Sequence, residues 1–224
     1  GLKRLEEGRD MDEWYLREWA GVDPANGSPL WYTTDENGKR TTTNSYNKAD
    51  RVYCGSAAPK FTGGWMNSFS YKGFTLTANF DFVYGNLLYN QSRELLDSDG
   101  AYADYNSMKL KSGWKRWEKE GDIATHPKAI NGGNKNSNKS SSRYLEKGNY
   151  FSLRNLSLGY SIPEKLCGKL GLQRVNVSCS ADNLFTLTPF SGVSPQLSDS
   201  STDGYAGTIY PLSRRIVLGL NVSF

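Results

Sequence analysis

The side chains that could do chemistry in this 224-residue sequence are few and scattered. Two carboxylate pairs, Glu118 with Glu120 and Asp97 with Asp99, have the residue type that general acid–base hydrolysis requires. Both pairs fall in segments expected to be loops, where no regular element would fix the separation of the two carboxyl groups. We therefore interpret them as solvated charge. No nucleophile–base pair or phosphate loop accompanies them, so the sequence does not predict an enzyme.

Metal and thiol chemistry are also poorly represented. A single histidine, His126, leaves out most histidine-based chemistry. Asp23, Asn26 and Asp35 share residue types with a calcium loop, but the spacing and closing Glu of an EF-hand are missing, and turns explain them better. The cysteines are odd in number and unpatterned, which favours neither a disulfide framework nor a zinc site: Cys54, Cys167 and Cys179. We predict no metal and no cofactor.

The composition indicates a β protein with long polar loops. Hydrophobic residues make up 37% of the chain and aromatic residues 13%, and there are 23 glycines. The net charge of +4 comes from scattered basic residues without an arginine-rich stripe, which argues against nucleic-acid binding. No apolar run approaches the roughly 18 residues of a transmembrane helix, but membrane strands give a much weaker hydropathy signal.

The last ten residues, 215–224, indicate the kind of element from which the chain is built. Strand side chains alternate between two faces, and this segment alternates between apolar and mostly polar or small residues before it ends on an aromatic, Phe224. An aromatic at the end of such a strand suits a closed membrane barrel, whose strands carry aromatics at the bilayer interface. The same alternation is cleanest over 74–84, which matches the ~9–11 residues of a membrane-spanning strand.

We predict an all-β fold, an antiparallel transmembrane β-barrel. The expected strands are approximately 12–21, 60–71, 74–85, 148–161, 173–186 and 212–224. The first could also be a short helix, although its aromatic density favours a strand. A change of parity near Arg154 and Asn155 predicts a β-bulge, and Lys72-Gly73 predicts a tight hairpin turn.

Long and short connections alternate strictly between these strands. The long ones are 22–58, 86–147 and 187–211, and the short ones are 72–73 and 162–172. Within 86–147, short helices are possible over 91–97 and 107–119. A barrel with long loops on one rim and short turns on the other has this arrangement, which places the short turns on the periplasmic side.

Several segments together resemble the C-terminal part of SusC/RagA-type TonB-dependent outer-membrane transporters of Bacteroidota. The matching segments are 18–32, 55–65 running into 69–74, 150–160, 180–186 and 219–224. Members of that family have an N-terminal plug and a barrel on the order of 22 strands. The resemblance therefore implies that this chain is the C-terminal segment of a large antiparallel transmembrane β-barrel, as a fragment or a truncated form that lacks the plug and the N-terminal strands.

The resemblance implies import of a large nutrient, most often a glycan and sometimes a peptide, across the outer membrane. It also implies as partners a SusD-like surface lipoprotein, the remainder of the same transporter, outer-membrane lipid, and TonB–ExbB–ExbD acting through the plug.

On this interpretation the residues of interest fall into three sets. The residues expected to face lipid are Phe74, Leu76, Phe80, Phe82, Val175, Val177, Leu218, Leu220, Val222 and Phe224. The residues expected to face the lumen or plug are Asn79, Asp81, Asn176, Ser178, Asp182 and Asn221. The loop aromatics that could contact a substrate or lid are Tyr102, Tyr105, Trp114, Trp117, Tyr205 and Tyr210.

A second hypothesis belongs to a different class of protein. A soluble or surface β-sandwich that binds carbohydrate would use tryptophan rings as stacking platforms, and the candidates would be Trp14, Trp31, Trp65, Trp114 and Trp117. Extraction behaviour separates the two, because a protein recovered in the soluble fraction without detergent would contradict the transporter hypothesis.

Overall fold

The computed structural model describes residues 1–105, 107–196 and 204–224 of the chain. Residue 106 of the predicted loop 86–147 and residues 197–203 of the predicted loop 187–211 lie outside the described residues. The chain forms two compact units. The sheet unit comprises Pro59–Gly85, Gly148–Pro189 and Tyr210–Phe224, and the loop unit comprises Gly1–Ala58, Asn86–Lys147 and Phe190–Ile209.

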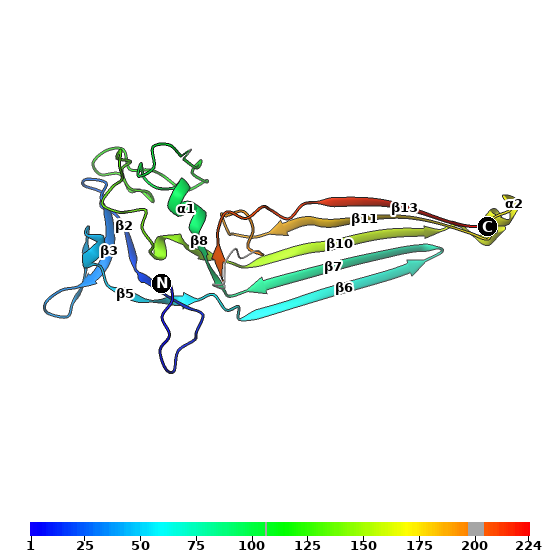
Figure 1. Ribbon diagram of the computed structural model, residues 1–224, viewed down its shortest axis with the longest axis horizontal. Coiled ribbons are helices and arrows are strands. Elements are labelled where there is room, and N and C mark those ends of the chain that lie inside the picture. The colour runs from blue at the N-terminus through cyan, green and yellow to red at the C-terminus, as the bar shows by residue number, and fades with distance from the viewer. Residues whose placement is uncertain (106, 197–203) are drawn as a thin grey trace. The chain divides into compact units, whose positions relative to one another are not determined.

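The sheet unit is built on five antiparallel strands in the order β13–β11–β10–β7–β6 (Figure 1). They are β6 (Phe61–Tyr71), β7 (Phe74–Tyr84), β10 (Tyr150–Ser161), β11 (Arg174–Leu187) and β13 (Arg215–Ser223). The shortest has 9 residues and the longest 14, so each is long enough to cross a bilayer, which takes ~9–11 residues. The predicted all-β fold is confirmed, as an open piece of a sheet.

The register places most apolar residues of the five strands on one face, because directly opposed residues lie on the same side of a sheet. One row across the sheet joins Phe69, Leu76, Leu158, Cys179 and Leu218. The next row joins Tyr71, Phe74, Tyr160, Val177 and Leu220. We call this side of the sheet the apolar face.

A β-bulge keeps β10 in step with this face, as its parity switch predicted. The register shifts between Leu153 and Asn155 in the pairing of β10 with β7 and again in its pairing with β11. Leu153 and Leu156 therefore both reach the apolar face, although they differ in parity along the strand. Asn183 of β11, close to the shift, has a positive φ of 52°.

Two short connections close one end of the sheet. The β6–β7 turn has positive φ at Lys72 (46°) and Gly73 (86°), as a two-residue hairpin with a type I′ turn requires. A side chain at Gly73 would meet Ser161 O at 2.7 Å, so only glycine fits there. The other connection, between β10 and β11, contains the short helix α2 (Glu164–Lys169). Strand β13 ends at the same end of the sheet (Figure 1).

The loop unit contains three small sheets and short helical segments. Strand β1 (Glu13–Arg17) pairs with β5 (Arg51–Ser56). Strand β3 (Pro29–Thr34) lies between β2 (Trp19–Val22) and β4 (Arg40–Thr43), and β8 (Leu87–Asn90) lies between β9 (Leu145–Lys147) and β12 (Tyr205–Ala206). The helical segments are α1 (Gln91–Leu96), η1 (Tyr46–Lys48) and η2 (Ser142–Tyr144). Within the described residues, no helix is long and apolar enough to cross a membrane.

Two expectations for this unit are wrong. Residues 12–21 do not form one membrane strand, because the chain leaves one sheet after Arg17 and enters another at Trp19. A helix over 107–119 is also missing from its described residues. The backbone turns there instead, with Gly113 at a φ of 85° and Trp114 N–H donating to Lys111 O.

Aromatic packing explains why residues 13–17 belong to the loop unit. Trp14 and Leu16 are buried in one cluster with Tyr89 and Tyr144. The Trp14 indole N–H donates to Leu87 O at 2.9 Å, and its ring centroid lies 5.8 Å from that of Tyr89. A buried tryptophan with a satisfied N–H contributes large apolar burial, so this packing holds the start of the chain to β8.

Candidate functional site

The six loop aromatics predicted to contact substrate or lid do not form one cluster. Tyr102, Tyr105, Trp114, Trp117 and Tyr205 belong to the loop unit, whereas Tyr210 belongs to the sheet unit and is 85% exposed. Of the six, only Tyr102 and Tyr105 lie next to each other with their rings partly exposed. Their centroids lie 5.4 Å apart at an interplanar angle of 37°, and each side chain is about half exposed.

The two tyrosines border a hollow of about 230 Å³ in the loop unit. Polar groups from neighbouring segments line it as well, among them Ser98, Asp99 and Arg116. Phenol rings beside hydroxyl, carboxylate and guanidinium groups can stack on a flat ligand and hydrogen-bond to its polar groups. This hollow is therefore the best-formed candidate contact site among the predicted loop aromatics.

Two of the other predicted aromatics are engaged within the loop unit. Trp117 is 8% exposed, its indole N–H donates to Pro24 O at 2.9 Å, and a Cβ on Gly27 would lie 2.6 Å from its ring. Its prediction as a contact residue is wrong, because the ring packs on the turn at residues 24–27. Trp114 is half-buried under the Arg93 guanidinium, 4.3 Å from the ring centroid.

The ring of Tyr205 also packs against other aromatic side chains of the loop unit. It lies in β12 and stacks almost parallel on Tyr89, with the ring centroids 5.8 Å apart. Its ring is partly buried against the aromatic cluster around Trp14.

The loop unit holds a buried ionic cluster that the sequence did not reveal. Asp97 and Asp99 have fully buried side chains, and three arginines surround them. Arg93 Nη2 lies 3.0 Å from Asp97 Oδ2, Arg116 Nη1 lies 2.7 Å from Asp99 Oδ1, and Arg143 donates to both Asp99 oxygens. Interpreting Asp97 and Asp99 as solvated charge is therefore wrong.

This cluster ties together segments that lie far apart in the sequence. Arg93 comes from α1 and also contacts Glu146 of β9 at 3.1 Å, while Arg143 comes from η2. Asp99 additionally accepts a hydrogen bond from Ser137 Oγ at 2.6 Å. Because Asp99 and Arg143 are 44 residues apart, no local pattern pointed to the pair. Arg93 and Asp97, four residues apart on a predicted helix, were the one available signal.

His126 belongs to the same cluster. It is 1% exposed and its Nε2 lies 2.9 Å from Asp97 Oδ2. Its Nδ1 lies 2.8 Å from Thr125 Oγ1, which also lies 3.1 Å from Lys115 O. A hydroxyl has a single hydrogen, so Thr125 donates either to the ring or to the carbonyl. Rotation of that hydroxyl satisfies both the neutral and the protonated ring, and His126 thereby joins Asp97 to the segment at Lys115.

Asp97 makes the stability of the loop unit depend on pH. Burial raises its pKa, but the hydrogen bond from His126 and the charges of Arg143 and Arg93 outweigh that effect and leave the pKa below its ordinary value. A carboxyl with a depressed folded-state pKa stabilises the fold above its unfolded pKa of ~3.9, and this stabilisation is lost as pH falls through the folded-state value.

We therefore expect the denaturant midpoint of the loop unit to be flat from pH 7 to about 5 and to fall below about pH 4. Tryptophan fluorescence during urea titration measures it. The Asp97→Asn variant should show a lower midpoint and a shallower fall with acid. Stability that rose on acidification from pH 5 to 3 would contradict this assignment.

The residues predicted to face the lumen share the side of the sheet opposite the apolar face, as the register shows. They are Asn79, Asp81, Asn176, Ser178, Asp182 and Asn221. Two of them carry ion pairs. Asp81 contacts Arg154 at 2.9 Å and accepts from Tyr150 Oη at 3.1 Å. Asp182 contacts Arg215 at 2.7 Å and accepts from Asn155 Nδ2 at 2.7 Å.

The residues predicted to face lipid line the apolar face with one exception. Leu218 is 80% exposed and Leu220 is 70% exposed. Val175 is only 8% exposed, because it lies at the start of β11 beside the connection that carries α2, where Ile162 N–H donates to Val175 O. The prediction that Val175 faces lipid is therefore wrong. Phe224 lies just beyond β13 and is 83% exposed.

The thiols are free. Cys167 is buried, Cys179 is exposed on the apolar face, and Cys54 is half-buried. Burial raises the pKa of the Cys54 thiol to about 11, so the group stays protonated and unreactive at neutral pH. Among the described residues, no group of His, Cys, Asp and Glu side chains is placed to hold a metal ion.

Comparison with curated proteins finds similar receptors in one bacterium. “TonB-dependent receptor P39” of Formosa agariphila is 32% identical over 181 residues, which cover 78% of this chain and 17% of the relative. “TonB-dependent receptor P3” of the same organism is 29% identical over 246 residues, covering 98% of this chain and 23% of the relative. The chain thus spans about a fifth of the length of these relatives. No protein-family model matches the sequence.

Solved structures of transporters also resemble this chain. A structure of the RagAB peptide transporter matches with a TM-score of 0.75 at 28% identity, over 95% of this chain and 23% of that chain. The RagAB peptide importer in its closed-closed state matches with a TM-score of 0.76 at 27% identity, over 100% of this chain and 25% of that chain.

Proposed function

Because this chain belongs to the SusC/RagA-type TonB-dependent receptors, of which it is a barrel portion, we propose that it forms part of the wall and surface loops of an outer-membrane importer of large nutrients. The five strands of the sheet unit cross the membrane. The loop unit belongs to the side from which substrate arrives.

The observation that carries this proposal is the exposed apolar face of a single sheet. Trp65, Phe69 and Leu218 are each more than 60% exposed, although they lie in the middle or toward the ends of long paired strands. Soluble monomers rarely expose so large a contiguous apolar surface. Lipid tails would cover it, because only closed barrels and helices can cross a bilayer with their backbone groups satisfied.

The opposite face suits a water-filled lumen. Ion pairs between Asp81 and Arg154 and between Asp182 and Arg215 occupy it. Charged residues are strongly disfavoured toward lipid at mid-bilayer and tolerated toward the lumen. The predicted lumen residues would line the transport path or touch the plug, and the long connections would lie on the extracellular rim.

The remaining parts of the importer are proposed partners. The rest of the barrel would pair with the open edges at β6 and β13, since an unpaired strand edge is not tolerated in lipid. A SusD-like lipoprotein would cover the extracellular rim, and TonB–ExbB–ExbD would supply energy through the plug. Outer-membrane lipid would surround the apolar face.

We favour a glycan or oligosaccharide as substrate. The tyrosine pair at 102 and 105 offers two half-exposed rings beside hydroxyl groups and a guanidinium, and such rings can stack on sugar faces while polar groups bind their hydroxyls. A peptide is the second candidate. It is favoured by the match to structures described as a RagAB peptide transporter and importer.

A carbohydrate-binding β-sandwich fits the molecule less well. Two of its proposed platforms, Trp14 and Trp31, are completely buried, and Trp117 is nearly so. Among the described residues, the sheet unit holds one five-stranded sheet, so the apolar face has no second sheet of that unit packed on it. A sandwich requires that second layer.

Import assays with the full-length receptor test the function. Cells that depend on this receptor for a labelled oligosaccharide should lose uptake when it is deleted. Tyr102→Ala with Tyr105→Ala should weaken surface binding about 5- to 150-fold, from roughly 0.5–1.5 kcal/mol for each ring. Ile123→Ala, an 81% exposed apolar residue of the same loop unit, is the control.

Each result has a defined meaning. Uptake of a labelled peptide but not of the oligosaccharide would select the second candidate. Unchanged uptake of both after deletion of the receptor would contradict the import function. Unchanged binding in the double tyrosine variant would remove the tyrosine pair from the contact site while leaving the import function standing.

A further inference from the structure

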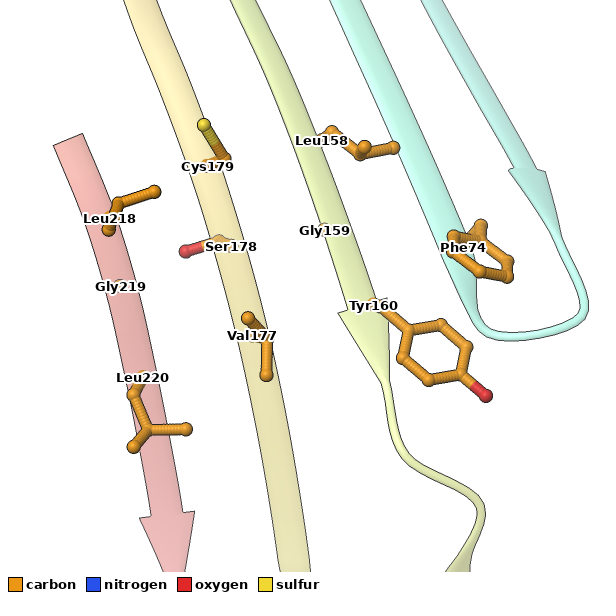
Figure 2. Close-up of a pocket in the computed structure, with 10 residues that line it drawn as sticks. All are labelled: Phe74, Leu158, Gly159, Tyr160, Val177, Ser178, Cys179, Leu218, Gly219 and Leu220. Carbon is orange, nitrogen blue, oxygen red and sulfur yellow. The ribbon is translucent and has the colours of Figure 1, made fainter. Parts of the chain in front are cut away.

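The apolar face contains a trough along β11. Figure 2 shows Val177 and Cys179 of β11 between Leu218 and Leu220 of β13 on one side and Leu158 and Tyr160 of β10 on the other. These side chains border a hollow of about 420 Å³ whose lining is almost entirely apolar. The hollow lies near the end of the sheet that carries the short connections, beside Phe74 at the β6–β7 turn (Figure 2).

The trough has a cause in the sequence. Over residues 177–181 strand β11 presents small side chains to the apolar face, and both neighbouring strands present larger ones at the positions paired with them. Farther along, β11 presents Phe185 and Leu187 to the same face. The small ones are Val177, Cys179 and Ala181. A row of small residues between two rows of larger ones leaves a groove that runs parallel to the strand.

Basic side chains gather at the end of the sheet nearest this groove. The two short connections and the first residue of β11 carry four basic residues and one acidic residue, Glu164. The basic ones are Lys72, Lys165, Lys169 and Arg174, and all four are exposed. Within the described residues, no ion pair engages them.

The spacing connects the two features. Lys165 and Lys169 follow Tyr160, which lines the hollow, in the connection that leaves β10, whereas Arg174 shares the parity of Asn176 and faces the other side of the sheet. A molecule with a linear apolar chain in the groove would thus place a polar group attached to that chain near Lys165 and Lys169. Exposed lysine and arginine side chains at a membrane surface attract anionic lipid headgroups.

We propose that the trough is a binding site for one acyl chain of an anionic phospholipid, whose headgroup is held by Lys165 and Lys169. The occupant belongs to the leaflet at the short-connection end of the sheet. The site rests on the proposed placement of the sheet in the membrane. It goes beyond that placement, because it distinguishes one lipid from those covering the rest of the apolar face.

Native mass spectrometry of the full-length receptor tests the site. The receptor is stripped of lipid in detergent and offered phosphatidylglycerol or phosphatidylcholine. The variant Cys179→Leu fills the trough with an apolar side chain. Ala78→Leu makes a comparable change on β7, where Ala78 shares the apolar face but does not border the hollow.

Wild type and Ala78→Leu should retain one phosphatidylglycerol that Cys179→Leu loses. A variant with Lys165→Gln and Lys169→Gln should retain the two lipids equally. Val177→Phe, which fills the trough from a second position, should repeat the loss seen with Cys179→Leu, and heat modifiability on gels confirms that each variant has folded.

Equal lipid retention by wild type and Cys179→Leu would overturn the site, and so would equal retention of the two headgroups by wild type. A dimer mass lost on Cys179→Leu would show that a second copy of the chain covers the trough instead. Failure of the wild-type receptor to insert into vesicles would contradict the membrane placement itself, and is thereby distinguished from an inserted receptor that shows no lipid preference.

Discussion

Replacement of Leu218 by lysine should impair assembly of the receptor in the membrane, with a cost of about 2–4 kcal/mol for a basic residue facing lipid at mid-bilayer. Leu218 is 80% exposed on the apolar face and paired with Cys179. Little protein packing is lost on substitution, so the effect reports the medium that the side chain faces. The folded fraction of full-length receptor in lipid vesicles, read from heat-modifiable migration on gels, measures it.

The neighbouring position gives a matched control. Val217 is also apolar and 45% exposed, but it faces the opposite side of the sheet, where it pairs with Ser180. Val217→Lys should assemble nearly as well as wild type, because a lysine there would reach the lumen. Equal impairment of the two variants, or of neither, would contradict the assignment of faces.

Asp99→Asn should destabilise the loop unit by about 3–5 kcal/mol, the cost of removing one partner from a buried ion pair. Asp99 is fully buried and contacts Arg116, Arg143 and Ser137. The substitution leaves the buried Arg143 guanidinium without one of its two carboxylates. Urea titration of the full-length receptor, followed by tryptophan fluorescence and by trypsin cleavage within 86–147, measures the change.

An exposed carboxylate in the same segment serves as the comparison. Asp104 is exposed and takes part in no ion pair among the described residues. Asp104→Asn should leave both readouts within about 0.5 kcal/mol of wild type. A similarly small effect for Asp99→Asn would show that the ionic cluster does not hold the loop unit together.

The sheet unit could be predicted from the sequence because its signals are local. Alternation over Phe74–Tyr84 defined β7 almost to the residue, and Lys72-Gly73 identified the turn before it. The parity switch at Arg154 located the bulge in β10. Each of these features depends on neighbouring residues along one strand, which side-chain alternation makes readable.

The loop unit could not be predicted in the same way, because contacts between distant residues determine it. Trp14 and Trp117 have the residue type of exposed binding platforms, and only their partners Leu87 and Pro24 show that they are buried. Arg143 is 44 residues from Asp99. Burial turned two aspartates that were interpreted as solvated into the centre of an ionic cluster, and neither spacing nor composition encodes that burial.

The central claim is that the sheet unit crosses a membrane with one face in lipid and the other in water. Single spin labels along 74–84 test it most directly, in full-length receptor reconstituted in vesicles with Cys54, Cys167 and Cys179 replaced by serine or alanine. Collision with oxygen should peak at 74, 76, 78, 80, 82 and 84, and collision with a water-soluble nickel complex at 75, 77, 79, 81 and 83. Oxygen and nickel accessibilities that did not alternate, or water access on both sets of positions, would contradict the account.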